Sequence, residues 1–171
     1  MHIHILLDVS GSMQAKREEV VKMVNNIIHD DQYDASTTIS LHLFNDKMRR
    51  IYKQIPIKEA RDFTLEDYEP INSTKLYDAL YYVLQKHYVK DMLLFVITDG
   101  ADNSSNISKE YVEDILRRKK DVKLVCLVED WVEWETLESS DYIPYVDIHT
   151  VSNTCNEISS QYQLTLDTVH G

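Results

Sequence analysis

The stretch LLDVSGSM, residues 6–13, ends an apolar run with an aspartate and two serines at alternate positions. A short, continuous apolar run that turn residues follow is typical of a buried strand. Asp8, Ser10 and Ser12 are spaced two apart, so a tight loop can point all three side chains at one place, and Gly11 adds no bulk beside them. Both a solvated turn and a metal site fit this pattern.

Composition limits the partners of the chain. Its 171 residues are expected to form a single domain, residues 1–171, with a formal net charge of −11. This charge argues against nucleic acid and against an anionic membrane surface as partners, whereas it suits the binding of cations.

No apolar run approaches the ~20 residues that span a bilayer, and no basic segment precedes the first apolar run, as it would in a signal peptide. We therefore expect an intracellular, cytoplasmic location.

Apolar runs and amphipathic helical patterns alternate along the whole chain. Strands are expected at 3–9, 37–45, 49–57, 91–100, 122–129 and 145–152, and helices at 13–29, 75–89, 108–120, 131–140 and 154–168. The strand at 37–45 alternates as a half-buried strand does, and Ser108 is expected to cap the helix at 108–120. The link between the second and third strands is too short for a crossover helix, so these two strands should be antiparallel. The sequence therefore predicts an α/β fold: a mostly parallel six-stranded sheet with one antiparallel edge strand and helices on both faces.

Three loops should reach the carboxyl edge of this sheet, where open α/β sheets bind their ligands. Asp8, Ser10 and Ser12 follow the first strand, Thr74 precedes a helix, and Asp99 follows the strand within 91–100. The first and third loops meet if their two strands are neighbours. Carboxylate and hydroxyl oxygens without thiols or imidazoles are the ligands of a hard divalent cation such as Mg²⁺.

Each of these residues also has a purely structural interpretation. Ser12 and Thr74 could be helix N-caps, Asp8 a capping carboxylate, and Asp99 with Gly100 an ordinary turn pair. The conjunction of the three motifs is what favours a metal site over these alternatives.

At these residues the sequence resembles the von Willebrand factor type A (vWA) family. The segments DVSGS, STKLYDAL and VITDGADN are similar to the three motifs of the metal-ion-dependent adhesion site (MIDAS) of that family. The resemblance implies a Rossmann-like, doubly wound fold. It also implies that Asp8, Ser10, Ser12, Thr74 and Asp99 coordinate Mg²⁺ or Mn²⁺, some through water. The expected function is binding a partner protein through an Asp or Glu carboxylate, with no catalysis.

Two other functions remain open. A Mg²⁺-dependent phosphatase-like hydrolase with Asp8 as nucleophile would lack the second acid two positions on, because Ser10 stands there. The three glycines of the chain also rule out the G-x-G-x-x-G and Walker patterns. Alternatively, the metal could merely tie loops together in a structural domain, in which case it would have no open coordination position.

Two further features receive a structural interpretation. Trp131 and Trp134 are expected to bury one face of a short helix, with an exposed anchor for a partner as the alternative. His2 and His4 lie two apart on the first strand and could face one ion. Because no third ligand is expected near them, we interpret them as strand residues.

Overall fold

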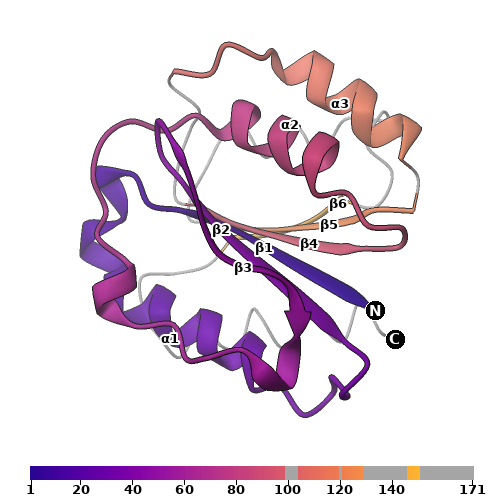
Figure 1. The fold of residues 1–171 in the computed structure, drawn as a ribbon. Helices are drawn as coiled ribbons and strands as arrows, with labels where there is room; N and C mark the ends of the chain where they lie inside the picture. Colours follow the sequence, from indigo (N-terminus) through magenta and orange to yellow (C-terminus); the bar gives the residue numbers. More distant parts are fainter. Residues whose placement is uncertain (99–103, 120, 129–145, 151–171) are drawn as a thin grey trace.

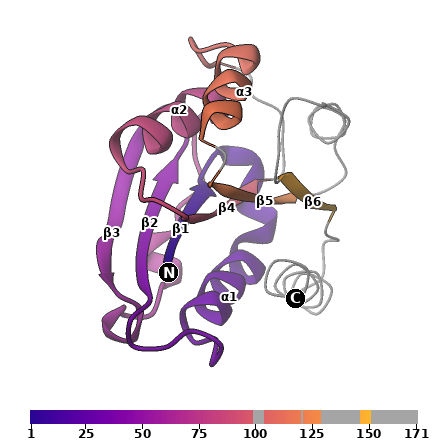
Figure 2. The same cartoon turned by 90° about the vertical axis from the view of Figure 1, so that its right-hand side faces the viewer.

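The computed structural model describes residues 1–98, 104–119, 121–128 and 146–150. Its elements, where η marks a 3₁₀ turn, are β1 (His2–Asp8), η1 (Gly11–Lys16), α1 (Arg17–Ile28), β2 (Thr38–Phe44), β3 (Met48–Pro56), η2 (Ile57–Glu59), η3 (Leu65–Asp67), α2 (Leu76–Lys86), β4 (Leu93–Thr98), α3 (Lys109–Arg118), β5 (Lys123–Val128) and β6 (Val146–Thr150). The strands form one sheet in the order β3-β2-β1-β4-β5-β6, which Figure 2 shows. Among the strands that the structure describes, only β2 and β3 pair antiparallel. The predicted α/β fold with a mostly parallel sheet and one antiparallel pair is confirmed.

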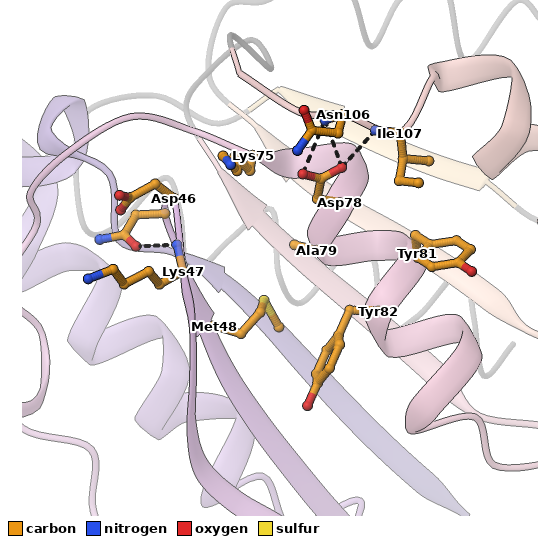
Figure 3. A pocket seen from close by; sticks show the side chains of 11 residues that line it. Asp46, Lys47, Met48, Lys75, Asp78, Ala79, Tyr81, Tyr82, Asn106 and Ile107 are labelled. Carbon is orange, nitrogen blue, oxygen red and sulfur yellow. Dashed lines mark hydrogen bonds between the residues drawn. The ribbon is translucent and has the colours of Figure 1, made fainter.

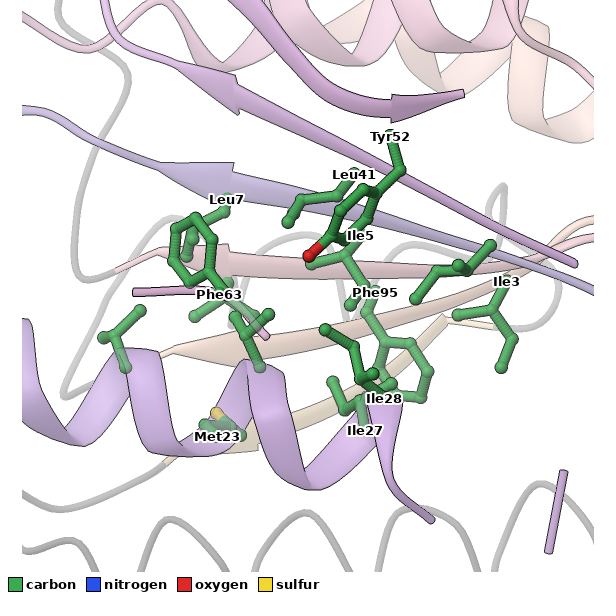
Figure 4. Close-up of a cluster of buried hydrophobic side chains, with 14 of the residues drawn as sticks. Ile3, Ile5, Leu7, Met23, Ile27, Ile28, Leu41, Tyr52, Phe63 and Phe95 are labelled. Carbon is green, nitrogen blue, oxygen red and sulfur yellow. The ribbon is translucent and has the colours of Figure 1, made fainter. Parts of the chain in front are cut away.

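Helices cover both faces of the sheet, with α1 on one face and α2 and α3 on the other (Figure 1). Alternate residues of β1 divide between two cores. Ile3, Ile5 and Leu7 pack on the α1 side, which Figure 4 shows. Leu6 belongs to the core under α2 and α3. The even positions of β1, which include His4 and Asp8, therefore share the α2 face, because successive strand side chains point to opposite faces.

The winding of the sheet reverses between β1 and β4, which lie side by side. Their register pairs Leu7 with Ile97, so the next residues along the two strands, Asp8 and Thr98, end together at the carboxyl edge. The condition for the first and third candidate loops to meet, that their strands are neighbours, is therefore met.

Two elements differ from expectation. Strand β2 is buried at every position after Thr38 rather than half-buried, because it lies inside a sheet that is covered on both faces. The expected helix over 13–29 begins as the 3₁₀ turn η1 and becomes α-helical only at Arg17. The helices expected at 131–140, with Trp131 and Trp134, and at 154–168 lie outside the described residues. Within the described ranges, no helix is long and apolar enough to cross a membrane.

Candidate metal centre

The carboxylate of Asp8 is completely buried and held in one orientation. The backbone N–H of Ser10 donates to Asp8 Oδ1 at 2.7 Å, and the hydroxyl of Thr98 donates to Asp8 Oδ2 at 2.6 Å. The buried hydroxyl of Tyr68 donates to the backbone carbonyl of Asp8 at 2.6 Å. Both carboxylate oxygens and the main chain are thus fixed by donors from three separate segments.

Ser10 and Ser12 stand side by side immediately after Asp8. Their hydroxyl oxygens lie 3.3 Å apart, Ser10 buried and Ser12 exposed. The N–H of Met13 donates to the Ser10 carbonyl at 3.0 Å as the chain turns into η1. The alternative interpretation of Ser12 as a helix N-cap is wrong, because Ser12 lies inside η1 and the residue that precedes α1 is Lys16.

Residues 71–74 are placed beside this loop by main-chain hydrogen bonds. The N–H of Ile71 donates to the Val9 carbonyl at 2.9 Å, and the N–H of Gly11 donates to the Asn72 carbonyl at 3.0 Å. Asn72 has φ of 69°, a left-handed conformation that asparagine tolerates better than most residues. A Cβ on Gly11 would lie 3.7 Å from the Asn72 carbonyl oxygen, which is an ordinary contact, so Gly11 is not needed to provide space.

Asn45, just after β2, holds the other side of the same segment. The side-chain amide of Asn45 donates to the Ile71 carbonyl at 3.0 Å, and the backbone carbonyl of Asn45 accepts the N–H of Lys75 at 3.0 Å. Thr74 is buried between these anchors. It is not the N-cap of α2, a position that Lys75 occupies, so the capping interpretation of Thr74 is also wrong.

Asp99 lies outside the described residues, and its chain neighbour Thr98 contacts Asp8. Where the description resumes, Ser104 Oγ lies 3.1 Å from Ser73 Oγ and 3.2 Å from the Thr74 carbonyl oxygen. The chain therefore leaves β4 next to Asp8, and the next described residue, Ser104, lies next to Thr74. The first candidate loop, the segment around Thr74 and the end of β4 converge on one edge of the sheet.

A pocket of about 420 Å³ adjoins this edge, between the turn from β2 to β3 and the first half of α2 (Figure 3). Lys75 lines it, one residue beyond Thr74. On its far side the carboxylate of Asp78 accepts the backbone N–H groups of Asn106 and Ile107 at 2.8 to 3.1 Å. These bonds fasten the chain that follows Ser104 to α2.

The donor set fits a hard cation. The described candidates offer one carboxylate, from Asp8, and the hydroxyls of Ser10, Ser12 and Thr74, all of them oxygen ligands. No group of three His, Cys, Asp or Glu side chains in the described part of the chain could hold a metal ion. A site here therefore depends on serine and threonine hydroxyls, and its second carboxylate would be that of Asp99.

A family model described as von Willebrand factor type A domain matches residues 2–139. The chain belongs to this family. vWA domains typically mediate protein–protein interaction and are not enzymes as a rule. No curated protein sequence matches the chain.

Solved structures agree on the vWA fold. Proximal thread matrix protein 1 from the mussel byssus superposes with a TM-score of 0.71 at 18% identity, covering 98% of this chain and 45% of the other. A von Willebrand factor type A protein from Catenulispora acidiphila gives 0.74 at 14% identity, covering 96% and 41%. The mussel protein is also similar in a structure with a zinc-occupied MIDAS motif, at a TM-score of 0.64 and 17% identity, covering 96% and 45%. The chain thus spans less than half the length of these proteins.

Sequence reasoning missed the two residues that hold Asp8 in place. Thr98 precedes Asp99 in the T-D-G motif, so its position at a strand end was a usable signal. Tyr68 gave no such signal, because its contact with Asp8 spans 60 residues.

Proposed function

We propose that this vWA domain is a metal-dependent protein-binding module. In this proposal Asp8, Ser10, Ser12, Thr74 and Asp99 hold Mg²⁺ or Mn²⁺, some of them through water. The ion engages an Asp or Glu carboxylate of a partner protein.

The buried and fixed carboxylate of Asp8 is the observation that carries the proposal. Burying a carboxylate costs several kcal/mol unless charges or hydrogen bonds compensate it. The donors described for it, the Ser10 N–H and the Thr98 hydroxyl, are neutral. A divalent cation at the same edge would place an opposite charge beside this carboxylate, and the nearby hydroxyls supply further oxygen ligands. The zinc-occupied MIDAS in the mussel protein supports the use of a divalent ion by this fold.

The chemistry of partner binding follows from the charge of the ligand set. Serine and threonine hydroxyls are neutral, so an ion that contacts one aspartate directly and the other through water keeps net positive charge. Such an ion attracts an anionic oxygen at an open coordination position. Ile71, whose side chain is 59% exposed, stands next to the candidate ligands on a main chain that is fixed at both its N–H and its carbonyl. It offers apolar contact area to the residues that flank the partner's acid.

The metal is tested by calorimetric titration of Mg²⁺ and Mn²⁺ into metal-stripped protein. We expect saturable binding to wild type and none to a Thr74→Ala, Asp99→Ala double variant that retains its fold. Asp31→Ala, at an exposed aspartate in the turn after α1, is the control and should bind like wild type. Equal binding by the double variant would reject this ligand set.

The open coordination position is tested by water-proton relaxation of the Mn²⁺ complex. An ion with exchangeable water enhances relaxation, and acetate, as a minimal carboxylate ligand, should reduce that enhancement as it displaces the water. A bound ion with no relaxation enhancement would be closed to partners and would instead tie loops together, which would overturn the binding function while leaving the metal site intact.

A further inference from the structure

Four histidines gather on the α2 face of the sheet, away from the candidate metal centre. His2 and His4 come from β1, His42 from β2, and His87 directly follows α2. The rings of His4 and His42 stack with centroids 5.0 Å apart, and His4 Nε2 lies 3.0 Å from His42 Nδ1. The ring of His87 lies 4.4 Å from that of His42 and 6.0 Å from that of His4. We call these four residues the histidine cluster.

The rings of the histidine cluster are buried, and some of their buried nitrogen atoms lack hydrogen-bond partners. His4 is 0% exposed and His42 2% exposed. The ring atoms His2 Nε2, His4 Nδ1 and His87 Nε2 are buried without a hydrogen-bond partner. Because the cluster lies within the described residues, where no group of histidines could hold a metal ion, it is not a preformed metal centre. Each neutral imidazole has one nitrogen that can take up a proton, so the cluster can respond to pH.

Burial makes protonation of the folded cluster unfavourable. It is the largest cause of the low pKa values, which are about 4 for His2 and for His42 and well below 6.5 for His4, and neighbouring histidines contribute to those of His42 and His4. The pKa of His87 is also lowered, by burial first. If a segment carries one of these rings into water, the pKa of that histidine returns to an ordinary value.

The charges that face the cluster add to this effect. Arg50 and Lys53 of β3 lower the pKa values of His42 and His87, and the amino group of Met1 acts on His2. From α2, Tyr82 packs against the rings of His42 and His87 at 6.1 and 5.1 Å. From β2, Thr38 hydrogen-bonds His2 at 2.8 Å. In the part of the chain that the structure describes, the ionic groups acting on the cluster are thus all cationic.

We propose that the histidine cluster is a proton-sensitive latch, which holds the C-terminal end of α2 on the sheet and releases it when the pH falls below about 6. His87 is the member that α2 carries, whereas His4 and His42 lie in strands paired on both sides. The helix end is therefore the part that can move. Its departure lets water reach His42 and His87, and the repulsion among like charges then favours the open form.

The size of the effect follows from proton linkage. The opened form binds a proton on His42 at an ordinary pKa of 6.5, and the closed form binds it at about 4. The free energy that favours the closed form is therefore unaffected at pH values above 6.5, and it decreases as the pH falls from 6.5 toward 4. Between pH 7 and pH 5, this one residue should raise the opening equilibrium constant about 20-fold.

Hydrogen exchange measures this opening directly. We expect amides in residues 82–89, including the His87 N–H that donates to the Val83 carbonyl, to exchange about 20-fold faster at pH 5 than at pH 7, after correction for intrinsic rates. Strand β4 should change by less than about threefold. Equal acceleration of β4 would indicate global acid unfolding and would overturn the latch, as would unchanged exchange in 82–89.

Matched variants assign the effect to the cluster. His42→Leu should keep α2 protected at pH 7 and reduce its acceleration at pH 5 to less than about threefold. If this variant does not fold, His42→Gln, whose side chain is polar but does not titrate, should show the same reduction. His29→Gln, at an exposed histidine that contacts Asp62, should keep the full 20-fold response. A wild-type response in whichever His42 variant folds would overturn the proposal.

Discussion

Replacing Thr98 with valine removes the hydroxyl that donates to Asp8 Oδ2 at 2.6 Å and changes little else. Valine has the same shape and suits a buried strand, so the backbone of β4 should be retained. A hydrogen bond to a charged group contributes about 1.5 to 3 kcal/mol. For a domain of this size, 1 kcal/mol corresponds to about 2 to 4 °C in Tm, so we expect a decrease of about 3 to 12 °C in EDTA. Loss of the positioning bond should also weaken Mn²⁺ binding about 10- to 100-fold.

Thr98→Ser is the matched control, because it keeps the hydroxyl and loses one methyl group. It should melt slightly below wild type and bind Mn²⁺ within about threefold of wild type. The assays are thermal unfolding in EDTA and calorimetric Mn²⁺ titration. If Thr98→Val melts and binds Mn²⁺ like wild type, Thr98 does not hold the carboxylate of Asp8 and the reasoning fails.

Three further substitutions test other parts of the structure. Tyr68→Phe removes the buried donor to the Asp8 carbonyl and should cost about 1 to 3 kcal/mol in urea unfolding; an unchanged midpoint would contradict that role. Gly11→Ala should change the unfolding free energy by less than about 0.5 kcal/mol, and a larger loss would show that the loop needs glycine after all. Hydrogen bonds from Arg61 lower the pKa of Asp67 from 3.8 to about 2, so the stability that Asp67 adds is present above pH 3.8 and lost as the pH falls toward 2. Asp67→Asn should therefore flatten the dependence of the urea midpoint on pH across this window, whereas a dependence like that of wild type would assign it to other groups.

The sequence was sufficient for the architecture because the signals for it are local. Short apolar runs and helical periodicity locate the strands and helices, and the short link after residue 45 requires an antiparallel pair. Ser108 illustrates how local such signals are, since it caps α3 as expected and accepts the Tyr111 N–H at 3.2 Å. The burial of β2 was missed because burial depends on which strands come to lie beside it.

The candidate ligand residues were predictable from the sequence, but the contacts that hold them in place were not. Neighbouring strands bring Asp8 to the end of β4, as the α/β topology requires. The bond from Tyr68, the anchoring of residues 71–75 by Asn45 and the histidine cluster each join segments more than 25 residues apart. No local pattern encodes such contacts, so His2 and His4 were interpreted as ordinary strand residues.

The anchoring of residues 71–75 has a consequence for protein engineering. Ile71 and Lys75 are anchored through their main chain, whereas Asn72 and Ser73 also bond Asp46 and Ser104 through their side chains. Exposed positions such as Ile71 can therefore be randomised in a library without displacing Thr74. The segment is a natural place to graft a new recognition sequence onto this domain.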